Sequence, residues 1–212
     1  MKSVCEIKRL HCTRCHRAEK TCICRWIVDM ASLVEVVILQ HPLEANQVKG
    51  SASLLHLSLS NSQMHIGELF DIAALSDVLY ASGKRPILLY PAFNEAVQHI
   101  VNAPPVFSDE LLEAPENCRL IVLDSTWRKS RKMLYLNPLL QTLPRLSLKD
   151  VPASHYHIRK AHSAHQLSSL EASCYALIQL EKNTKKYMPL LDAFDGFVDQ
   201  QMALREQNKS IK

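Results

Sequence analysis

Three short runs of nearly continuous apolar residues stand out along the chain, at residues 34–39, 86–91 and 120–123. Each run is rich in aliphatic residues and is bounded by polar residues or proline, as strands are. A strand that is covered on both faces shows continuous rather than alternating hydrophobicity. The pattern therefore predicts an α/β fold, with a mostly parallel sheet between flanking helices.

Less regular patterns surround these runs. Residues 145–148 and 155–159 are more polar strand candidates, which we expect nearer an edge of the sheet or a ligand surface. The apolar segment at 54–59 does not distinguish a helix from a strand. The sheet is thus expected to contain three well-marked strands and two weaker ones.

Two helices are predicted toward the C-terminus. The first begins at a capping box, in which Ser168 is the N-cap and Glu171 reaches back to it from three residues later. The second begins near Pro189, where apolar residues follow at the spacing of an amphipathic helix. Both helices would cover the predicted sheet.

A chain of 212 residues with 47% apolar content can bury one sizeable core. We expect a small N-terminal module at 1–30 and a main domain at 31–212. No apolar run approaches the roughly 18 to 20 residues of a membrane span, and charges interrupt the N-terminus where a signal peptide would be apolar. We therefore expect a cytoplasmic protein with reduced cysteines and no membrane contact. The sequence leaves both a monomer and a homodimer open.

The net charge of +4 hides blocks of opposite sign. Residues 1–25 hold seven Lys and Arg against two Asp and Glu, whereas residues 26–127 hold four against twelve. Residues 128–160 then hold eight against one, and the remainder is balanced. Charged residues are most often only solvated, but a basic block of this density indicates a polyanionic partner.

Four cysteines near the N-terminus form a metal-ligand pattern, at Cys12, Cys15, Cys22 and Cys24. This spacing allows two chelating turns to close on one tetrahedral ion. Zinc is the expected occupant, an iron–sulfur cluster is the alternative, and His11 or His16 could replace one thiolate. Two disulfides would conflict with reduced cysteines. Four protein ligands leave no open position, so the metal is expected to stabilise the module and not to catalyse.

Polar residues follow the third apolar run directly, at Asp124, Ser125, Thr126 and Trp127. Open α/β sheets bind ligands at the carboxyl ends of their strands, so this order suggests a small-molecule site. The carboxylate or either hydroxyl could instead simply cap the next helix. Four cations come next, at Arg128, Lys129, Arg131 and Lys132. They cannot all face one way on a helix, so about two of them would touch phosphate.

Further cations and histidines extend the predicted nucleic-acid surface. The candidates are Arg14, Arg17, His155, His157, Arg159 and Lys160. His155, His157 and Arg159 alternate onto one face of their strand candidate, where they could follow a phosphate backbone. None of the four glycines belongs to a Gly-rich phosphate loop. A nucleotide-like ligand would therefore be held by turns at strand ends.

Five short motifs occur in order along nearly the whole chain. They are Cys-x-Arg-Cys-x-Arg at 12–17, His-Pro-Leu-Glu at 41–44, Leu-Tyr-Pro at 89–91, Asp-Ser-Thr-Trp at 124–127 and Leu-Ser-Ser-Leu-Glu-Ala at 167–172. Together they resemble the DTW-domain family and, within it, the bacterial tRNA-uridine aminocarboxypropyltransferases. One departure is Val-Lys-Gly-Ser-Ala at 48–52, where the family has an Asn-Thr-Gly-Arg-like turn. Lys49 is the candidate to replace the missing arginine in tRNA binding.

The resemblance implies transfer of the 3-amino-3-carboxypropyl group of S-adenosylmethionine to N3 of a tRNA uridine, with 5'-methylthioadenosine as by-product. It also implies a SPOUT-like α/β fold with a C-terminal knot. The candidates for holding the donor are Leu89, Tyr90, Pro91, Leu123, Ser125, Thr126, Ser168, Ser169 and Glu171.

Asp124 and Trp127 are the catalytic candidates at this site. Asp124 is either the base that deprotonates N3 or the group that orients the uracil, and an ordinary Asp is acidic for a base. Glu171 either binds the donor's amino group or only completes the capping box. Two other functions remain open, a SPOUT-type RNA methyltransferase with the same donor and a non-catalytic zinc module that binds RNA.

Overall fold

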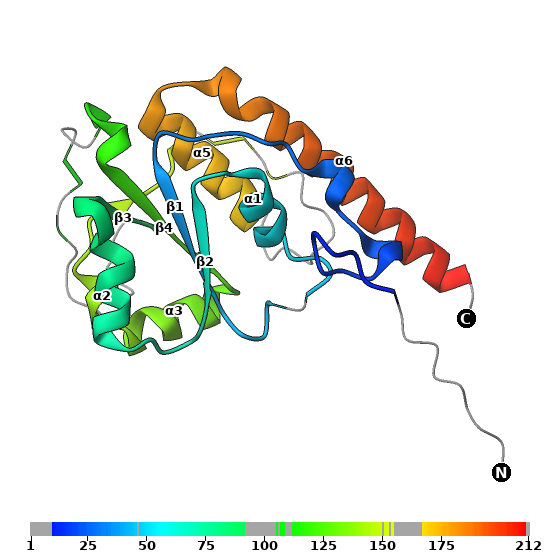
Figure 1. The fold of residues 1–212 in the computed structure, drawn as a ribbon, viewed down its shortest axis with the longest axis horizontal. Coiled ribbons are helices and arrows are strands. Elements are labelled where there is room, and N and C mark those ends of the chain that lie inside the picture. Colours follow the sequence, from blue (N-terminus) through cyan, green and yellow to red (C-terminus); the bar gives the residue numbers. More distant parts are fainter. Residues whose placement is uncertain are drawn as a thin grey trace, which may run out of the picture.

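A five-stranded parallel sheet forms the centre of the molecule, with strand order β2-β1-β4-β3-β5 (Figure 1). The strands are β1 Glu35–Gln40, β2 Ser62–Ile66, β3 Arg85–Leu89, β4 Cys118–Asp124 and β5 Arg145–Leu146. The computed structural model describes residues 10–45, 47–91, 105, 107–108, 112–149, 151–152, 154 and 167–210. The parallel sheet and the strands predicted from the three apolar runs are confirmed.

Helices cover both faces of the sheet. They are α1 Ala52–Ser58, α2 Ile72–Tyr80, α3 Trp127–Leu136, α4 Pro138–Gln141, α5 Ser169–Glu181 and α6 Thr184–Ser210. Figure 1 shows α1, α5 and α6 on one side of the sheet and α2 and α3 on the other. This layering explains why the strands are apolar at nearly every position.

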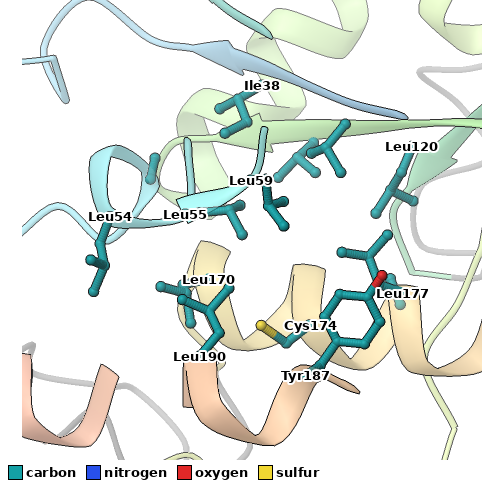
Figure 2. Close-up of a cluster of buried hydrophobic side chains, with 14 of the residues drawn as sticks. Ile38, Leu54, Leu55, Leu59, Leu120, Leu170, Cys174, Leu177, Tyr187 and Leu190 are labelled. Carbon is teal, nitrogen blue, oxygen red and sulfur yellow. The ribbon is translucent and has the colours of Figure 1, made fainter. Parts of the chain in front are cut away.

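The alternation of side chains along β1 divides the core into two clusters. Val36 and Ile38 point to the cluster that includes α1, α5 and α6, whereas Val37 and Leu39 point to the cluster beneath α2, α3 and α4. Figure 2 shows part of the first cluster, where Leu55 of α1, Leu170 of α5 and Leu190 of α6 lie near one another. The strands are thereby held from both sides.

Several elements differ from the sequence-based expectations. The ambiguous segment at 54–59 belongs to helix α1, and the sequence pattern missed β2 and α2 altogether. β2 is an edge strand of mostly polar, partly exposed residues, so it lacks the apolar signature of its neighbours. The prediction that the last helix begins near Pro189 is wrong: α6 begins at Thr184, and the Asn183 side chain accepts a hydrogen bond from the Lys186 amide.

The cysteine-rich N-terminal segment packs against helix α6. The Trp26 ring lies over Gly196, where an added Cβ would collide with the indole. The Trp26 indole N–H donates to the Gln200 side chain, which itself donates to the Cys22 carbonyl. Ile23 is fully buried in the same cluster as α5 and α6. The segment therefore shares a hydrophobic core with the sheet layer.

Two expectations concern residues outside the described part of the chain. The strand candidate at 155–159 lies entirely there. The connection from β5 to α5, on which the expected C-terminal knot depends, lies largely there as well. None of the described helices is both long and apolar enough to cross a membrane.

Candidate functional site

Asp124 is held at the carboxyl end of β4 by hydrogen bonds to both of its carboxylate oxygens. It lies beside Gln40, the last residue of β1, in the register of the two strands. The Gln40 side-chain amide donates to Oδ2 at 2.8 Å, and the Ser169 hydroxyl donates to Oδ1 at 2.5 Å. Asp124 is only 5% exposed. This buried carboxylate therefore joins β1, β4 and the first turn of α5.

The start of α5 is fixed by the predicted capping box, which the structure confirms. The Ser168 amide donates to Glu171 Oε2 at 2.8 Å, and the Glu171 amide donates to Ser168 Oγ at 3.1 Å. The Ser154 hydroxyl lies 2.9 and 2.8 Å from the two Glu171 oxygens. The Leu170 amide donates to the Ser51 hydroxyl, at the start of α1. The polar end of α5 is thus built into the same edge of the sheet as Asp124.

Tyr90 brings the end of β3 to this edge. Its ring packs against Trp127 in an edge-on contact at 5.9 Å, and its hydroxyl lies 3.4 Å from Ser130 Oγ. The Arg145 guanidinium lies over the Tyr90 ring, 5.2 Å from its centroid. Burial lowers the pKa of this guanidinium below its usual range. Trp127 remains 49% exposed, so one side of its indole is open to a ligand.

Two ion-pair groups fasten helix α3 to the loops after β1 and β2. Lys129 Nζ lies 2.8 Å from Oε1 of the buried Glu44. Lys132 Nζ lies 2.9 Å from Glu68 Oε2, and His41 Nε2 lies 3.1 Å from Glu68 Oε1. The hydrogen bonds from Lys132 and His41 hold the pKa of Glu68 below its usual range. These contacts set the orientation of α3 relative to Asp124.

His41 has a defined tautomer in this network. Its Nδ1 accepts a hydrogen bond from the Leu43 amide, so the ring proton is on Nε2, which donates to Glu68. The His41 amide also donates to the carbonyl of Asp124. The motif at 41–44 therefore shapes the loop beside Asp124 through hydrogen bonds.

The remaining donor-site candidates lie around the same strand ends. Leu89, Leu123 and Ser125 are half-buried, and Pro91 and Thr126 are exposed. Thr126 is the N-cap residue of α3, but its side chain makes no capping hydrogen bond. The Ser125 hydroxyl lies 3.3 Å from the Thr126 carbonyl. The alternative in which these hydroxyls cap the helix is therefore not what the described residues show.

The four predicted metal ligands converge on one point. The sulfur atoms of Cys12, Cys15, Cys22 and Cys24 all lie within 4.8 Å of one another. The separations are 3.5 Å for Cys12 to Cys24 and 3.8 Å for Cys15 to Cys22. Thiolates around a tetrahedral zinc ion lie roughly 3.8 Å apart, given a Zn–S bond of about 2.3 Å. The donor set and its spacing therefore fit zinc.

The backbone around Cys12 favours a ligating thiolate. The amides of Cys15 and Arg14 lower the Cys12 pKa to about 6. The turn closes because the Cys12 amide donates to the Arg17 carbonyl and the His16 amide donates to the Cys12 carbonyl. His16 has a positive φ of 55°, which lets the chain reverse after Cys15. Both sulfur pairs lie far beyond the disulfide bond length of about 2.05 Å, so disulfides do not explain the cluster.

The predicted tRNA-binding residues are dispersed in the structure. Arg17 donates to the carbonyls of Val48 and Gly50, and Arg14 pairs with Asp29 at 3.1 Å. Lys49, between Val48 and Gly50, is exposed on the loop after β1. Arg128, Lys129, Arg131 and Lys132 lie on α3. The remaining candidates, which lie outside the described residues, are His155, His157, Arg159 and Lys160.

Sequence reasoning missed three residues of the site. Gln40 carries no signal of its own, and its role follows only from the strand register that places it beside Asp124. Glu68 follows the polar edge strand β2, which was itself not predicted. Arg145 was included in a strand candidate, but the pairing of β3 with β5 places it over Tyr90.

Comparison with known proteins gives a consistent result. The family model described as "DTW domain" matches residues 9–202. The chain is 30% identical to "tRNA-uridine aminocarboxypropyltransferase 2" of Macaca fascicularis over 184 residues, which are 83% of this chain and 58% of that protein. It is 27% identical to the protein of the same name from Drosophila melanogaster over 182 residues, 82% of this chain and 68% of that one.

The chain thus spans a little over half the length of the macaque relative. A protein of the same name from Mus musculus is 28% identical over 184 residues, with the same coverage. These three relatives are animal proteins, so the likeness that they show is not specific to bacteria. No solved structure matches the chain.

Proposed function

The chain belongs to the DTW domain family, and we propose that it transfers the 3-amino-3-carboxypropyl group of S-adenosylmethionine to N3 of a tRNA uridine. The observation that carries this proposal is the convergence of the family's motifs on one sheet edge. Asp124 at the end of β4 is hydrogen bonded to Ser169 of α5, and Trp127 packs against Tyr90 after β3. Parallel α/β sheets bind ligands at this edge.

The donor would be held by the strand-end turns, in keeping with a SPOUT-like fold and with the lack of a Gly-rich loop. Tyr90 and Pro91, together with Leu89 and Leu123, would frame the adenosine. Ser125 and Thr126 would bind the carboxylate of the methionine moiety, because neither hydroxyl caps α3. The amino-terminal end of α5, at Ser168 and Ser169, adds the partial positive charge of a helix start.

The reaction forms one bond and breaks another at the same carbon. N3 of the uracil loses its proton and attacks the γ-carbon of the methionine moiety. The bond from that carbon to sulfur breaks, and its electron pair converts the sulfonium into the thioether of 5'-methylthioadenosine. The methyl group on the same sulfur is a competing target, so the pocket must orient the γ-carbon toward N3.

Asp124 serves as an orienting group in this proposal, and water accepts the proton from N3. Both carboxylate oxygens already accept hydrogen bonds, from Gln40 and Ser169. A general base must lie within hydrogen-bond reach of the proton that it removes, and Asp124 is only 5% exposed. The Asp124 carboxylate instead holds the start of α5 and the end of β1 at fixed positions around the substrate. Glu171, bonded to Ser168 and Ser154, serves the helix cap in the same way.

The four cysteines would hold a structural zinc ion. With four thiolate ligands the ion has no open position, so it stabilises the N-terminal segment and takes no part in the reaction. A thiolate site requires reduced cysteines, which supports a cytoplasmic location for the protein. The substrate tRNA would meet the two basic blocks, at 1–25 and 128–160.

Nucleoside mass spectrometry tests the proposed reaction directly. Purified protein is incubated with bulk tRNA and S-adenosylmethionine, and both nucleosides and small-molecule products are measured. We expect 3-(3-amino-3-carboxypropyl)uridine together with 5'-methylthioadenosine. Methylated nucleosides with S-adenosylhomocysteine would instead show an RNA methyltransferase. Unchanged nucleosides with retained tRNA binding would indicate a non-catalytic RNA-binding module.

A further inference from the structure

Helix α3 has three sides in different environments. With 3.6 residues per turn, Ser130, Met133 and Leu134 fall on one side, and all three are buried. Met133 and Leu134 belong to the hydrophobic cluster between the sheet and helices α2, α3 and α4. This side fixes the helix to the core and is closed to any partner.

The second side carries the two lysines, and both are paired within the protein. Lys129 is paired with the buried Glu44, and its own side chain is 27% exposed. Lys132 is 59% exposed, but it lies 2.9 Å from Glu68. Each positive charge therefore already has a carboxylate partner. A phosphate that bound either lysine would have to compete with that partner.

The third side is exposed and carries cations and aromatic rings together. Trp127, Arg128, Arg131 and Tyr135 lie within an arc of about 100° around the helix. Trp127 is 49% exposed and Tyr135 is 59% exposed, and both arginines are exposed as well. Within the part of the chain that the structure describes, neither arginine side chain has an ion pair or hydrogen bond. We call this surface the Trp127–Tyr135 face.

We propose that the Trp127–Tyr135 face is where tRNA docks, with Arg128 and Arg131 on phosphates and the Tyr135 ring stacked on an unpaired base. This assignment rests on the proposed function. Arginine beside exposed aromatic rings suits single-stranded nucleic acid, because guanidinium groups bind phosphate and every base has a face that can stack. The face also begins the chain's densest basic block, at 128–160.

The position of the face connects the docked RNA to the donor site. Trp127 lies at one end, where its ring contacts Tyr90 beside Asp124. Arg131 follows four residues later, about 6 Å along the helix axis at a rise of about 1.5 Å per residue. One nucleotide spans a similar distance, so a phosphate on Arg131 leaves the neighbouring base within reach of Trp127. The helix thereby leads a strand of RNA to the reacting group.

Binding of labelled bulk tRNA without donor, measured by fluorescence anisotropy over a range of salt concentrations, tests the docking face. Arg128→Gln and Arg131→Gln should each weaken binding and reduce the slope of log Kd against log salt by about 0.7 to 1. Tyr135→Ala should weaken binding about 5- to 100-fold with the slope unchanged, whereas Tyr135→Phe should retain wild-type affinity, because stacking needs only the ring.

Lys129→Gln and Lys132→Gln are the matched controls, since they remove the same charge from the same helix. We expect wild-type salt slopes for both, with thermal unfolding used to confirm that each variant is folded. Lysine variants that reduce the slope as much as the arginine variants would overturn the proposal, because net charge alone would then explain binding. Arginine variants with wild-type slopes would overturn it as well.

The proposed activity and the docking face can fail separately. If the wild-type protein binds tRNA through the arginines but forms no modified uridine, the docking face is supported and the proposed reaction is contradicted. If the Arg128→Gln, Arg131→Gln double variant forms product and binds tRNA as tightly as the wild type, the docking face is contradicted and the proposed reaction is supported.

Discussion

At the scale of single residues, the strand-end carboxylate has a different environment from the one its motif suggests. The motif alone left Asp124 open as either a base or a group that orients the uracil, in a site at the end of a strand. In the structure Asp124 is 5% exposed and accepts hydrogen bonds from Gln40 and Ser169. Both donors come from other elements, so the carboxylate acts as a junction. Its contribution to the reaction would be geometric.

The substitution Asp124→Asn separates the two roles of this residue. We expect kcat to fall by no more than about tenfold, because Asn can still accept from Ser169 and the Gln40 amide can rotate to pair with its new NH2 group. Loss of a general base would cost about 100- to 10,000-fold and would remove a limb of the pH–rate profile. Kinetics with saturating tRNA distinguish the two outcomes.

Asp124→Ala tests the structural role of the same carboxylate. It removes both hydrogen bonds and leaves Gln40 and Ser169 without their shared acceptor. We expect the free energy of unfolding to fall by about 2 to 4 kcal/mol, as measured by urea denaturation. A variant as stable as the wild type would show that the carboxylate is not a structural junction.

At the scale of elements, the loop after β1 links the cysteine cluster to the proposed donor site. Arg17 donates to the carbonyls of Val48 and Gly50, and the next residue, Ser51, accepts from the Leu170 amide of α5. Ser169, one residue earlier, bonds to Asp124. A continuous set of contacts therefore runs from the N-terminal segment to the strand end.

Arg17→Gln tests this link. We expect kcat/KM for S-adenosylmethionine to fall about tenfold with metal content unchanged. The loop loses the two hydrogen bonds that hold it, so the start of α5 is positioned less accurately around the donor. Arg14→Gln removes an equal charge from the exposed pair with Asp29 and should leave donor kinetics unchanged. Equal effects of the two variants would mean that charge, and not the loop contact, matters.

The packing of Trp26 on α6 explains a glycine within that helix. Any Cβ at position 196 would collide with the indole, so Gly196→Ala should destabilise the protein by about 1 to 3 kcal/mol, despite the higher helix propensity of alanine. In a Trp26→Ala background the same substitution should be neutral or stabilising, because the collision is gone. Thermal unfolding of the wild type, the two single variants and the double variant gives the coupling free energy between positions 26 and 196.

At the scale of the whole molecule, the N-terminal segment and the sheet layer form one packed body. Cys15 and Ile23 belong to the same buried cluster as α5 and α6. The boundary that we predict near residue 30 stays a prediction. The shared core leads us to expect that the two parts unfold together.

Cys12→Ser tests both the metal and this cooperativity. We expect it to release zinc, detected by mass spectrometry of the metal, and to lower the temperature of a single unfolding transition. His16→Asn is the control, because it removes one of the two histidines that could replace a thiolate, while Asn tolerates the positive φ at that position. A wild-type protein without zinc would end the zinc proposal, and two separate transitions would favour independent domains.

The sequence predicted the central strands and the capping box of α5, and it indicated that four cysteines would cluster, because each is a local pattern. Apolar runs report that a strand is buried on both faces, whichever partners cover it. The Ser168 and Glu171 pair needs only its own helix. The sequence pattern does not predict the edge strand β2, because a polar, partly exposed strand has no apolar run. It also places the start of α6 too late, because Pro189 resembles a first helical residue, whereas the helix is capped by Asn183.

The sequence by itself determined which chemical groups this protein has at its strand ends and in its cysteine cluster. Only the tertiary structure decided which of those groups are already engaged. Asp124 is paired through strand register and the docking of α5, and Lys129 and Lys132 are paired through loops far away along the chain. The physical reason is that hydrogen bonds and ion pairs depend on distances of about 3 Å between atoms, which folding alone sets.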